Sequence, residues 1–185
     1  TAVCGIVTIL GRNPARREID ANLAAEVLPK MLASLNHRGP DEQTMVQLGG
    51  VWLGHTRLSI IDLQTGSQPL YNESGLVAAI LNGEIYNYRE LRRGLGAKRF
   101  RTASDTEAIV QLAKGKLDPQ QWVPRLDGMF AFALVDGSEL VLARDPLGIK
   151  PLYLFRDATR VAFGSELKAL LPLLPTSPAL NADAI

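Results

Sequence analysis

Two spacings of hydrophobic residues follow one another along the chain, one typical of strands and one typical of helices. Residues 3–10 form an apolar, β-branched run, which predicts a buried strand. Residues 19–35 show the helical spacing, with apolar side chains at every fourth position: Leu23, Val27, Met31 and Leu35. This spacing predicts an amphipathic helix that packs on a sheet.

Short apolar runs separated by turn residues fill the rest of the chain. They predict strands at residues 50–55, 58–61, 76–81, 85–88, 129–135, 139–143, 152–155 and 161–163. Short helices are predicted at residues 87–94, 104–114, 120–125 and 165–171. Because strands outnumber helices and the helices are clustered, the pattern favours an α+β fold with mainly antiparallel sheets.

Two local motifs have more than one interpretation. Asn82-Gly83 follows an apolar strand and is the strongest two-residue hairpin signal. A turn there could also present the Asn82 amide and the Gly83 N–H to a developing oxyanion. Further on, Ser104 and Glu107 have the spacing of a capping box, in which Glu107 bonds back to the N–H of the capping serine.

Composition narrows the class of protein. The 185 residues are 46% hydrophobic and 21% charged, with a net charge of +1. This balance gives no electrostatic reason to expect a nucleic acid or a membrane surface as partner. We find neither an apolar run of membrane-spanning length nor a secretory signal, and a single cysteine suits a reducing compartment, so we expect a cytoplasmic protein. One cysteine and two histidines predict no metal site.

That cysteine, Cys4, is either an inert strand residue or a nucleophile. A cysteine at a chain start can use its own α-amine as base, because the two groups titrate near ~8 and ~8.5. The next residue, Gly5, would let a substrate approach the backbone. His55 is an alternative base, although it is more readily a satisfied strand histidine. His37 is expected to cap a helix end.

Three further groups can be structural or functional. Arg57 is either a snorkelling arginine at a strand edge or a planar fork for a substrate carboxylate. Asp105, at a helix start, is either a partner of the helix dipole or of a substrate ammonium. Arg144 and Asp145 are expected to form a buried ion pair that anchors a turn.

Taken together and in this order, the motifs resemble one family. They occur at residues 4–6 (CGI), 38–41 (RGPD), 55–62 (HTRLSIID), 68–70 (QPL), 82–88 (NGEIYNY), 104–107 (SDTE), 126–133 (LDGMFAFA), 144–153 (RDPLGIKPLY) and 163–166 (FGSE). The chain resembles the class II glutamine amidotransferase domain, and specifically that of glutamine-dependent asparagine synthetases, over about residues 4–170.

The resemblance implies an N-terminal-nucleophile hydrolase fold, a four-layer αββα sandwich. It implies that the domain hydrolyses L-glutamine to glutamate and ammonia through a thioester on Cys4. The oxyanion donors would be the Asn82 side chain and the Gly83 N–H. The remaining substrate-binding residues would be Arg57 on the α-carboxylate, Glu84 and Asp105 around the α-ammonium, and main-chain groups of Gly83, Leu58 and Ile61.

We predict a glutaminase domain at residues 1–170 and a proline-rich linker at residues 171–185, in which regular structure is not expected. The linker would lead to a synthetase domain in cis, beyond this chain. No cofactor is expected in the glutaminase domain, and ATP and Mg²⁺ would belong to the synthetase domain. Nucleic acid and membrane are not expected partners, and a homodimer stays open.

One departure from the family concerns the start of the chain. The family cysteine leads the mature protein, whereas Thr1, Ala2 and Val3 precede Cys4 here. They could be removed in the cell, be a cloning remnant or reflect a misassigned start codon at Val3, which is the interpretation we favour. Two alternative functions follow: a catalytically silent glutamine-binding module, and an amidotransferase whose acceptor is not aspartate.

Overall fold

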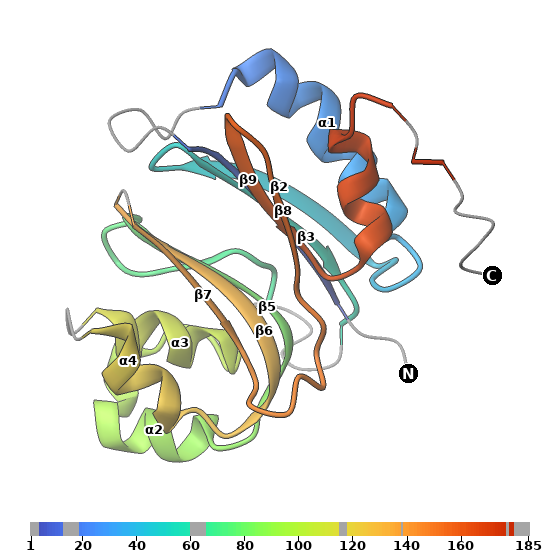
Figure 1. The fold of residues 1–185 in the computed structure, drawn as a ribbon. Coiled ribbons are helices and arrows are strands. Elements are labelled where there is room, and N and C mark those ends of the chain that lie inside the picture. The colour runs from blue at the N-terminus through green and yellow to red at the C-terminus, as the bar shows by residue number, and fades with distance from the viewer. Residues whose placement is uncertain are drawn as a thin grey trace.

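Two antiparallel sheets lie face to face, with helices on their outer faces (Figure 1). The computed structural model describes residues 4–12, 19–59, 66–114, 118–137, 139–176 and 178–179. In order across the first sheet, the strands are β2 (Glu42–Leu48), β3 (Val51–Arg57), β1 (Gly5–Gly11), β9 (Arg160–Gly164) and β8 (Tyr153–Arg156). Across the second sheet they are β4 (Leu70–Tyr71), β5 (Val77–Ile85), β6 (Gly128–Asp136) and β7 (Glu139–Arg144).

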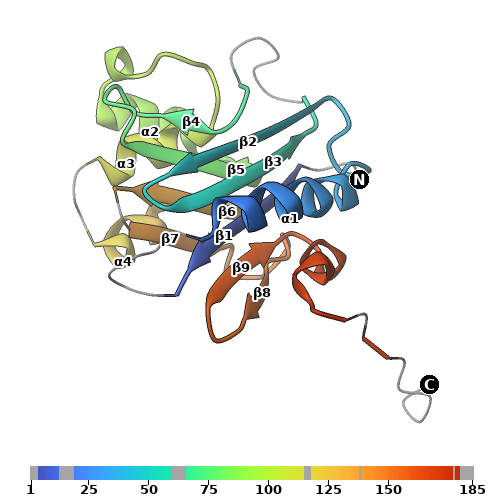
Figure 2. The same cartoon turned by 90° about the horizontal axis from the view of Figure 1, so that it is seen from above.

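Helical segments form the two outer layers. The first sheet is covered by α1 (Ala21–Ser34) and the 3₁₀ helix η3 (Leu167–Leu173), and Figure 2 shows α1 lying along that sheet. The second sheet is covered by the remaining helices, α2 (Tyr88–Leu95), η1 (Ala97–Arg99), α3 (Thr106–Ala113), α4 (Pro119–Trp122) and η2 (Val123–Arg125). The predicted four-layer arrangement is therefore present.

The core follows from the two-residue period of the strands. On β1, Val7 and Ile9 pack against α1, while Ile6 faces the second sheet. On β5, Ala79 and Leu81 face the helices, and Ile80 faces the first sheet. Each sheet is thus apolar on both faces. The molecule has one core between the sheets and another under each helical layer.

Several predicted elements are confirmed. α1 buries Ala24, Val27, Leu28, Met31 and Leu32, which is the stripe that the four-residue spacing predicts. The paired strands β6–β7 and β8–β9 are antiparallel neighbours, as expected from their short connections. In the described part of the chain, no helix is long and apolar enough to cross a membrane.

The strand prediction differs from the structure in several places. β2 was not predicted, because its side chains alternate only between half-buried and exposed at a sheet edge. The strand predicted at residues 58–61 is not formed at residues 58–59, and residues 60–61 lie outside the described residues. β5 runs unbroken through Asn82 and Gly83, so these residues do not form the hairpin turn that their local sequence favours.

The end of the chain also differs from its local sequence signal. Pro172 lies within η3, whose Leu170 and Leu173 are buried under the first sheet with α1. Burial of these two leucines stabilises the 3₁₀ helix although it contains a proline. Regular structure therefore continues to Leu173, three residues into the predicted linker. The domain boundary itself remains a prediction.

The predicted ion pair between Arg144 and Asp145 is wrong. Arg144 is exposed, whereas the Asp145 side chain is buried and accepts three backbone N–H groups. The donors are Phe130 at 3.3 Å, Ile149 at 2.8 Å and Lys150 at 3.0 Å. Backbone donors thus satisfy this carboxylate, and it anchors the turn after β7 without an ion pair to Arg144.

Candidate active site

The predicted site residues come from four separate elements and meet at one end of the space between the sheets. Cys4 immediately precedes β1, and the pairing of Gly5 with Thr56 brings it opposite Arg57, the last residue of β3. Leu58 follows Arg57 directly, and the second sheet and its helices contribute Asn82, Gly83 and Glu84 on β5 and Asp105 before α3. Ile61 lies outside the described residues.

The Cys4 thiol is held by the main chain of Leu58. The Leu58 N–H donates to Cys4 Sγ over 3.4 Å, and the Leu58 carbonyl oxygen is 3.7 Å from the sulfur. Burial raises the pKa of the thiol. The Leu58 N–H and the Arg57 guanidinium oppose this shift, while the Asp105 carboxylate adds to it. The net pKa is raised, so the thiol is protonated near neutral pH and needs a base to become a nucleophile.

His55 does not supply that base. It pairs across the sheet with Ile6, and its Nε2 lies 3.3 Å from the Leu81 carbonyl oxygen on β5. Burial lowers the pKa of His55 to about 4, so the neutral imidazole can donate its N–H to this carbonyl. His55 is therefore a satisfied core histidine. The expected helix cap by His37 is also wrong, because its Nε2 lies 2.9 Å from Glu166 Oε1.

The buried neutral histidine predicts a pH-dependent stability. The pKa of His55 is near 6.5 unfolded and about 4 folded, so the unfolded chain binds the extra proton between these values. Stability is then complete above pH 6.5 and falls as the pH drops toward 4. We expect His55 to remove about 2 kcal/mol of unfolding free energy between pH 7 and pH 5.

Urea unfolding at both pH values would measure this loss. His55→Gln keeps an amide donor near the Leu81 carbonyl but does not titrate. Between pH 7 and pH 5, its unfolding free energy should therefore fall by about 2 kcal/mol less than that of the unmodified protein. Equal changes in the two proteins would show that His55 is not buried in its neutral form.

Asn82 and Gly83 are placed by pairing between β5 and β6. Asn82 is fully buried, and its Nδ2 lies 3.4 Å from Ser165 Oγ on the opposite sheet. Gly83 has a φ of 139°, and a Cβ there would lie 2.0 Å from the Met129 carbonyl oxygen. Only glycine fits such a close approach of two strands. Contact between strands, and not a turn, therefore explains this glycine.

The direction of the Gly83 N–H follows from its neighbours. Leu81 N–H donates to Gln68 Oε1 at 2.6 Å, and Ile85 N–H donates to Asp105 Oδ2 at 2.9 Å. N–H groups two residues apart point to the same edge of a strand. The Gly83 N–H lies between these two donors and points to that same edge, away from β6.

Asp105 joins this edge of β5 to α3. Its carboxylate also accepts the Thr106 N–H at 2.9 Å, so Asp105 is the N-cap of α3. Burial raises the pKa of Asp105, and the nearby Glu84 carboxylate adds to this rise. The predicted capping box is wrong, because Asp105 is the N-cap and Glu107 accepts the N–H groups of Arg101 and Thr102 instead of that of Ser104.

Arg57 is almost buried at the end of β3. It is 6% exposed, and one guanidinium nitrogen lies 3.6 Å from Glu42 Oε2 on the neighbouring strand. The positive charge of Arg57 also lowers the pKa of the Cys4 thiol, as noted above. Gly5 also has a packing role that the sequence did not indicate. A Cβ there would lie 2.6 Å from Thr56 Oγ1 and 3.0 Å from Leu35, so Gly5 allows close packing within the fold.

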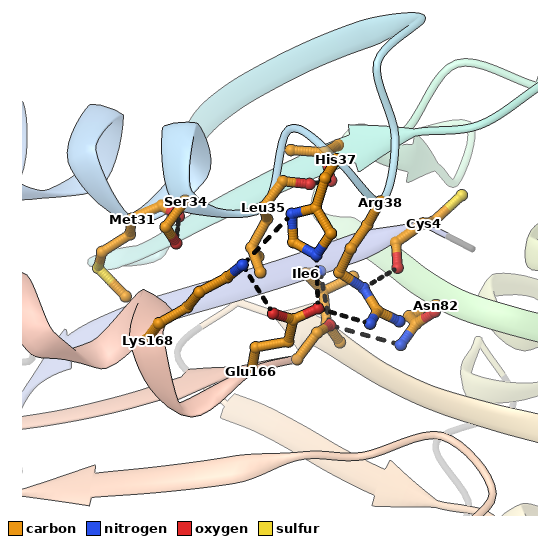
Figure 3. Close-up of polar contacts among 12 residues, drawn as sticks. Cys4, Ile6, Met31, Ser34, Leu35, His37, Arg38, Asn82, Glu166 and Lys168 are labelled. Atoms are coloured by element: carbon orange, nitrogen blue, oxygen red, sulfur yellow. Dashed lines mark hydrogen bonds and ion pairs between the residues drawn. The ribbon is translucent and has the colours of Figure 1, made fainter. Parts of the chain in front are cut away.

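Sequence reasoning missed a polar cluster that holds the Cys4 backbone (Figure 3). Arg38 Nε donates to the Cys4 carbonyl at 3.1 Å, and Arg38 also donates to Glu166 at 2.8 Å. Burial would raise the pKa of Glu166, but hydrogen bonds from Arg38, His37 and Lys168 lower it to about 2. Both ends of the cluster lie in family-like motifs, but nothing local links residues 128 positions apart.

A cavity of about 350 Å³ lies elsewhere, on the helical side of the second sheet. Trp122, Leu134 and Asp136 are among its lining residues, and none of the predicted site residues is. Within the described ranges, no group of three or more His, Cys, Asp or Glu residues could hold a metal ion.

A family model described as a glutamine amidotransferase domain matches residues 3–185. The chain therefore belongs to the glutamine amidotransferase domain family, as the motifs predicted. Its relatives include glutamine-hydrolyzing asparagine synthetase 3 of Arabidopsis thaliana, 40% identical over 174 residues. Another is glutamine-hydrolyzing asparagine synthetase 1 of Bacillus subtilis strain 168, 39% identical over 171 residues. Each match covers 91% of this chain but 28% or 27% of the relative.

Solved structures confirm the fold. Glutamine phosphoribosylpyrophosphate amidotransferase from B. subtilis, complexed with ADP and GMP, superposes with a TM-score of 0.69 at 24% identity. The superposition covers 90% of this chain and 43% of the B. subtilis enzyme. An allosteric regulatory enzyme of purine biosynthesis has the same TM-score at 22% identity, over 92% of this chain and 43% of that one. The predicted four-layer αββα sandwich with mainly antiparallel sheets is therefore confirmed.

Proposed function

We propose that this chain is a glutaminase domain that hydrolyses L-glutamine to glutamate and ammonia. The observation that carries the proposal is the position of the Cys4 thiol between the Leu58 main chain, Arg57 and Asp105 in a member of the glutamine amidotransferase family. The thiol would attack the side-chain amide carbon, form a thioester and release ammonia. Water would then cleave the thioester, release glutamate and restore the thiol.

Each predicted residue has one part in this reaction. Arg57 would bind the α-carboxylate, and Glu84 with Asp105 would face the α-ammonium. The Asn82 side chain and the Gly83 N–H would donate to the oxyanion. Once Cys4 is the first residue, its α-amine would take the thiol proton and pass it to the leaving ammonia.

The wider assignment also rests on the relatives. We propose that the ammonia passes to an ATP-dependent synthetase domain in the same protein, as the name of the Arabidopsis relative suggests. ATP and Mg²⁺ would bind that domain, and the glutaminase domain would need no cofactor. The acceptor would be aspartate and the compartment the cytoplasm.

Glutamate release from L-glutamine tests the proposal directly. The assay uses a chain verified by intact mass to begin at Cys4, with L-asparagine, one methylene shorter, as the control substrate. We expect release from glutamine and none from asparagine. Glutamine binding without glutamate release would favour the silent glutamine-binding module, and lack of binding would reject both functions.

Arg57→Lys is expected to raise KM for glutamine by about tenfold to a hundredfold, because a point charge cannot replace a planar fork on a carboxylate. Steady-state kinetics of glutamate release would measure the change. Arg160→Lys is a matched control, since Arg160 binds Asp157 through two nitrogens at 2.9 and 2.7 Å, outside the proposed site. An unchanged KM in Arg57→Lys would contradict the carboxylate assignment.

A further inference from the structure

Ser165 connects the strand that follows Cys4 to the proposed oxyanion donor. Its side chain is fully buried, and its Oγ accepts the Ile6 N–H at 2.9 Å. The Ser165 N–H returns to the Ile6 carbonyl at 3.0 Å, so backbone and side chain both bind β1. The same Oγ lies 3.4 Å from Asn82 Nδ2 on the other sheet. One hydroxyl therefore bridges the two sheets beside the nucleophile.

The Asn82 amide has one buried atom without a partner. Its Oδ1 accepts no hydrogen bond in the described structure, although Asn82 is 0% exposed. An unpaired buried acceptor is costly, so a neighbouring donor should bind it. Ser165 has such a donor, because a hydroxyl that accepts the Ile6 N–H still has its own proton to give.

Rotating the amide by 180° about χ2 brings these two groups together. Oδ1 then occupies the place of Nδ2, about 3.4 Å from Ser165 Oγ, and receives the hydroxyl proton. Nδ2 then takes the buried place of Oδ1, on the side away from Ser165, where its N–H groups have no partner in the described structure. An oxyanion needs this orientation, because the opposite one would direct an amide oxygen at the developing negative charge.

We propose that Ser165 is a positioning residue that fixes the Asn82 amide with its nitrogen toward the reacting carbonyl oxygen. This inference rests on the proposed glutaminase function. Ser165 does not touch the substrate and acts through Asn82. Because Ser165 is anchored to Ile6, two residues from Cys4, it also keeps the oxyanion donor in register with the nucleophile.

A double-mutant cycle in the chain that begins at Cys4 tests this role. We expect Asn82→Ala to lower kcat by about 10²–10³ and Ser165→Ala to lower it by about tenfold. KM should change less than about twofold, because the oxyanion forms only in the transition state. If Ser165 acts through Asn82, the double variant should be no slower than Asn82→Ala alone.

Thr8→Val is the matched control. Thr8 is 1% exposed on β1, and its hydroxyl oxygen has no hydrogen-bond partner in the described structure. Removing this buried hydroxyl should leave kcat unchanged. Thermal unfolding of every variant checks that the kinetics refer to folded protein. Should Ser165→Ala not fold, Ser165→Cys keeps the volume with a weak donor and should lower kcat by about threefold or more.

The outcomes separate the inference from the function on which it rests. An unmodified Cys4-first chain that does not hydrolyse glutamine would reject the proposed function. If the unmodified chain hydrolyses glutamine but Ser165→Ala leaves kcat unchanged, the role of Ser165 alone is overturned. Where Ser165→Ala does not fold, an unchanged kcat in Ser165→Cys has the same meaning. Multiplying effects in the double variant would do the same, because a purely structural contribution is independent of Asn82.

Discussion

A chain that begins at Cys4 is expected to hydrolyse L-glutamine about 10²–10⁴ times faster than one that retains residues 1–3. Burial raises the pKa of the Cys4 thiol, so the sulfur is protonated near neutral pH and needs a base. A nitrogen inside a peptide bond is delocalised and accepts no proton, whereas a free α-amine has a pKa near ~8. The preceding residues would thus remove the base and leave the nucleophile in place.

Two other titratable groups near the thiol already take part in hydrogen bonds of the fold. The imidazole of His55 donates to the Leu81 carbonyl and has a pKa of about 4. Asp105 already accepts the N–H groups of Ile85 and Thr106. Both groups are held by the fold in other hydrogen bonds, so the dependence on a free α-amine should be strong.

Glutamate release by the two chains, each verified by intact mass, would measure the effect. A chain that begins at Cys4 but carries an acetylated α-amine is the matched control, because it blocks only the proposed base. We expect it to be as slow as the longer chain. Equal rates in the free and acetylated chains would exclude the α-amine as base.

Cys4→Ala is expected to abolish glutamate release, a loss of about 10⁵–10⁶ in kcat by comparison with other covalent hydrolases. The sulfur is the only atom in the proposed site with the nucleophilicity to form the thioester. The sulfur is hydrogen-bonded to the main chain of Leu58 at the edge of the core, so its removal should leave the fold intact.

Binding separates loss of chemistry from loss of the site. Isothermal titration should show that Cys4→Ala still binds L-glutamine, because the expected contacts to the α-carboxylate and α-ammonium do not involve sulfur. Cys4→Ser serves as a control that keeps a hydroxyl opposite the Leu58 N–H and should also be nearly inactive. Turnover retained by Cys4→Ala would reject the nucleophile assignment.

Local sequence patterns correctly predicted the elements whose apolar and polar positions repeat within one continuous stretch of the chain. The apolar run at β1, the four-residue spacing of α1 and the β6–β7 hairpin all appear in the structure. The candidate residues were selected differently. Taken singly, Arg57 and Asp105 had acceptable structural explanations, and only the resemblance over many motifs favoured a shared site.

The sequence by itself thus determined most of the strands, α1, the family and the presence of a single cysteine, because periodicity and motif order are properties of the chain. Tertiary structure decided the path of β5 through Asn82-Gly83, since pairing with β6 outweighs a local turn preference. It also decided that His55 binds a carbonyl and that Arg38 and Ser165 reach the site. These contacts join residues far apart in the chain, and folding alone brings their atoms within hydrogen-bond distance.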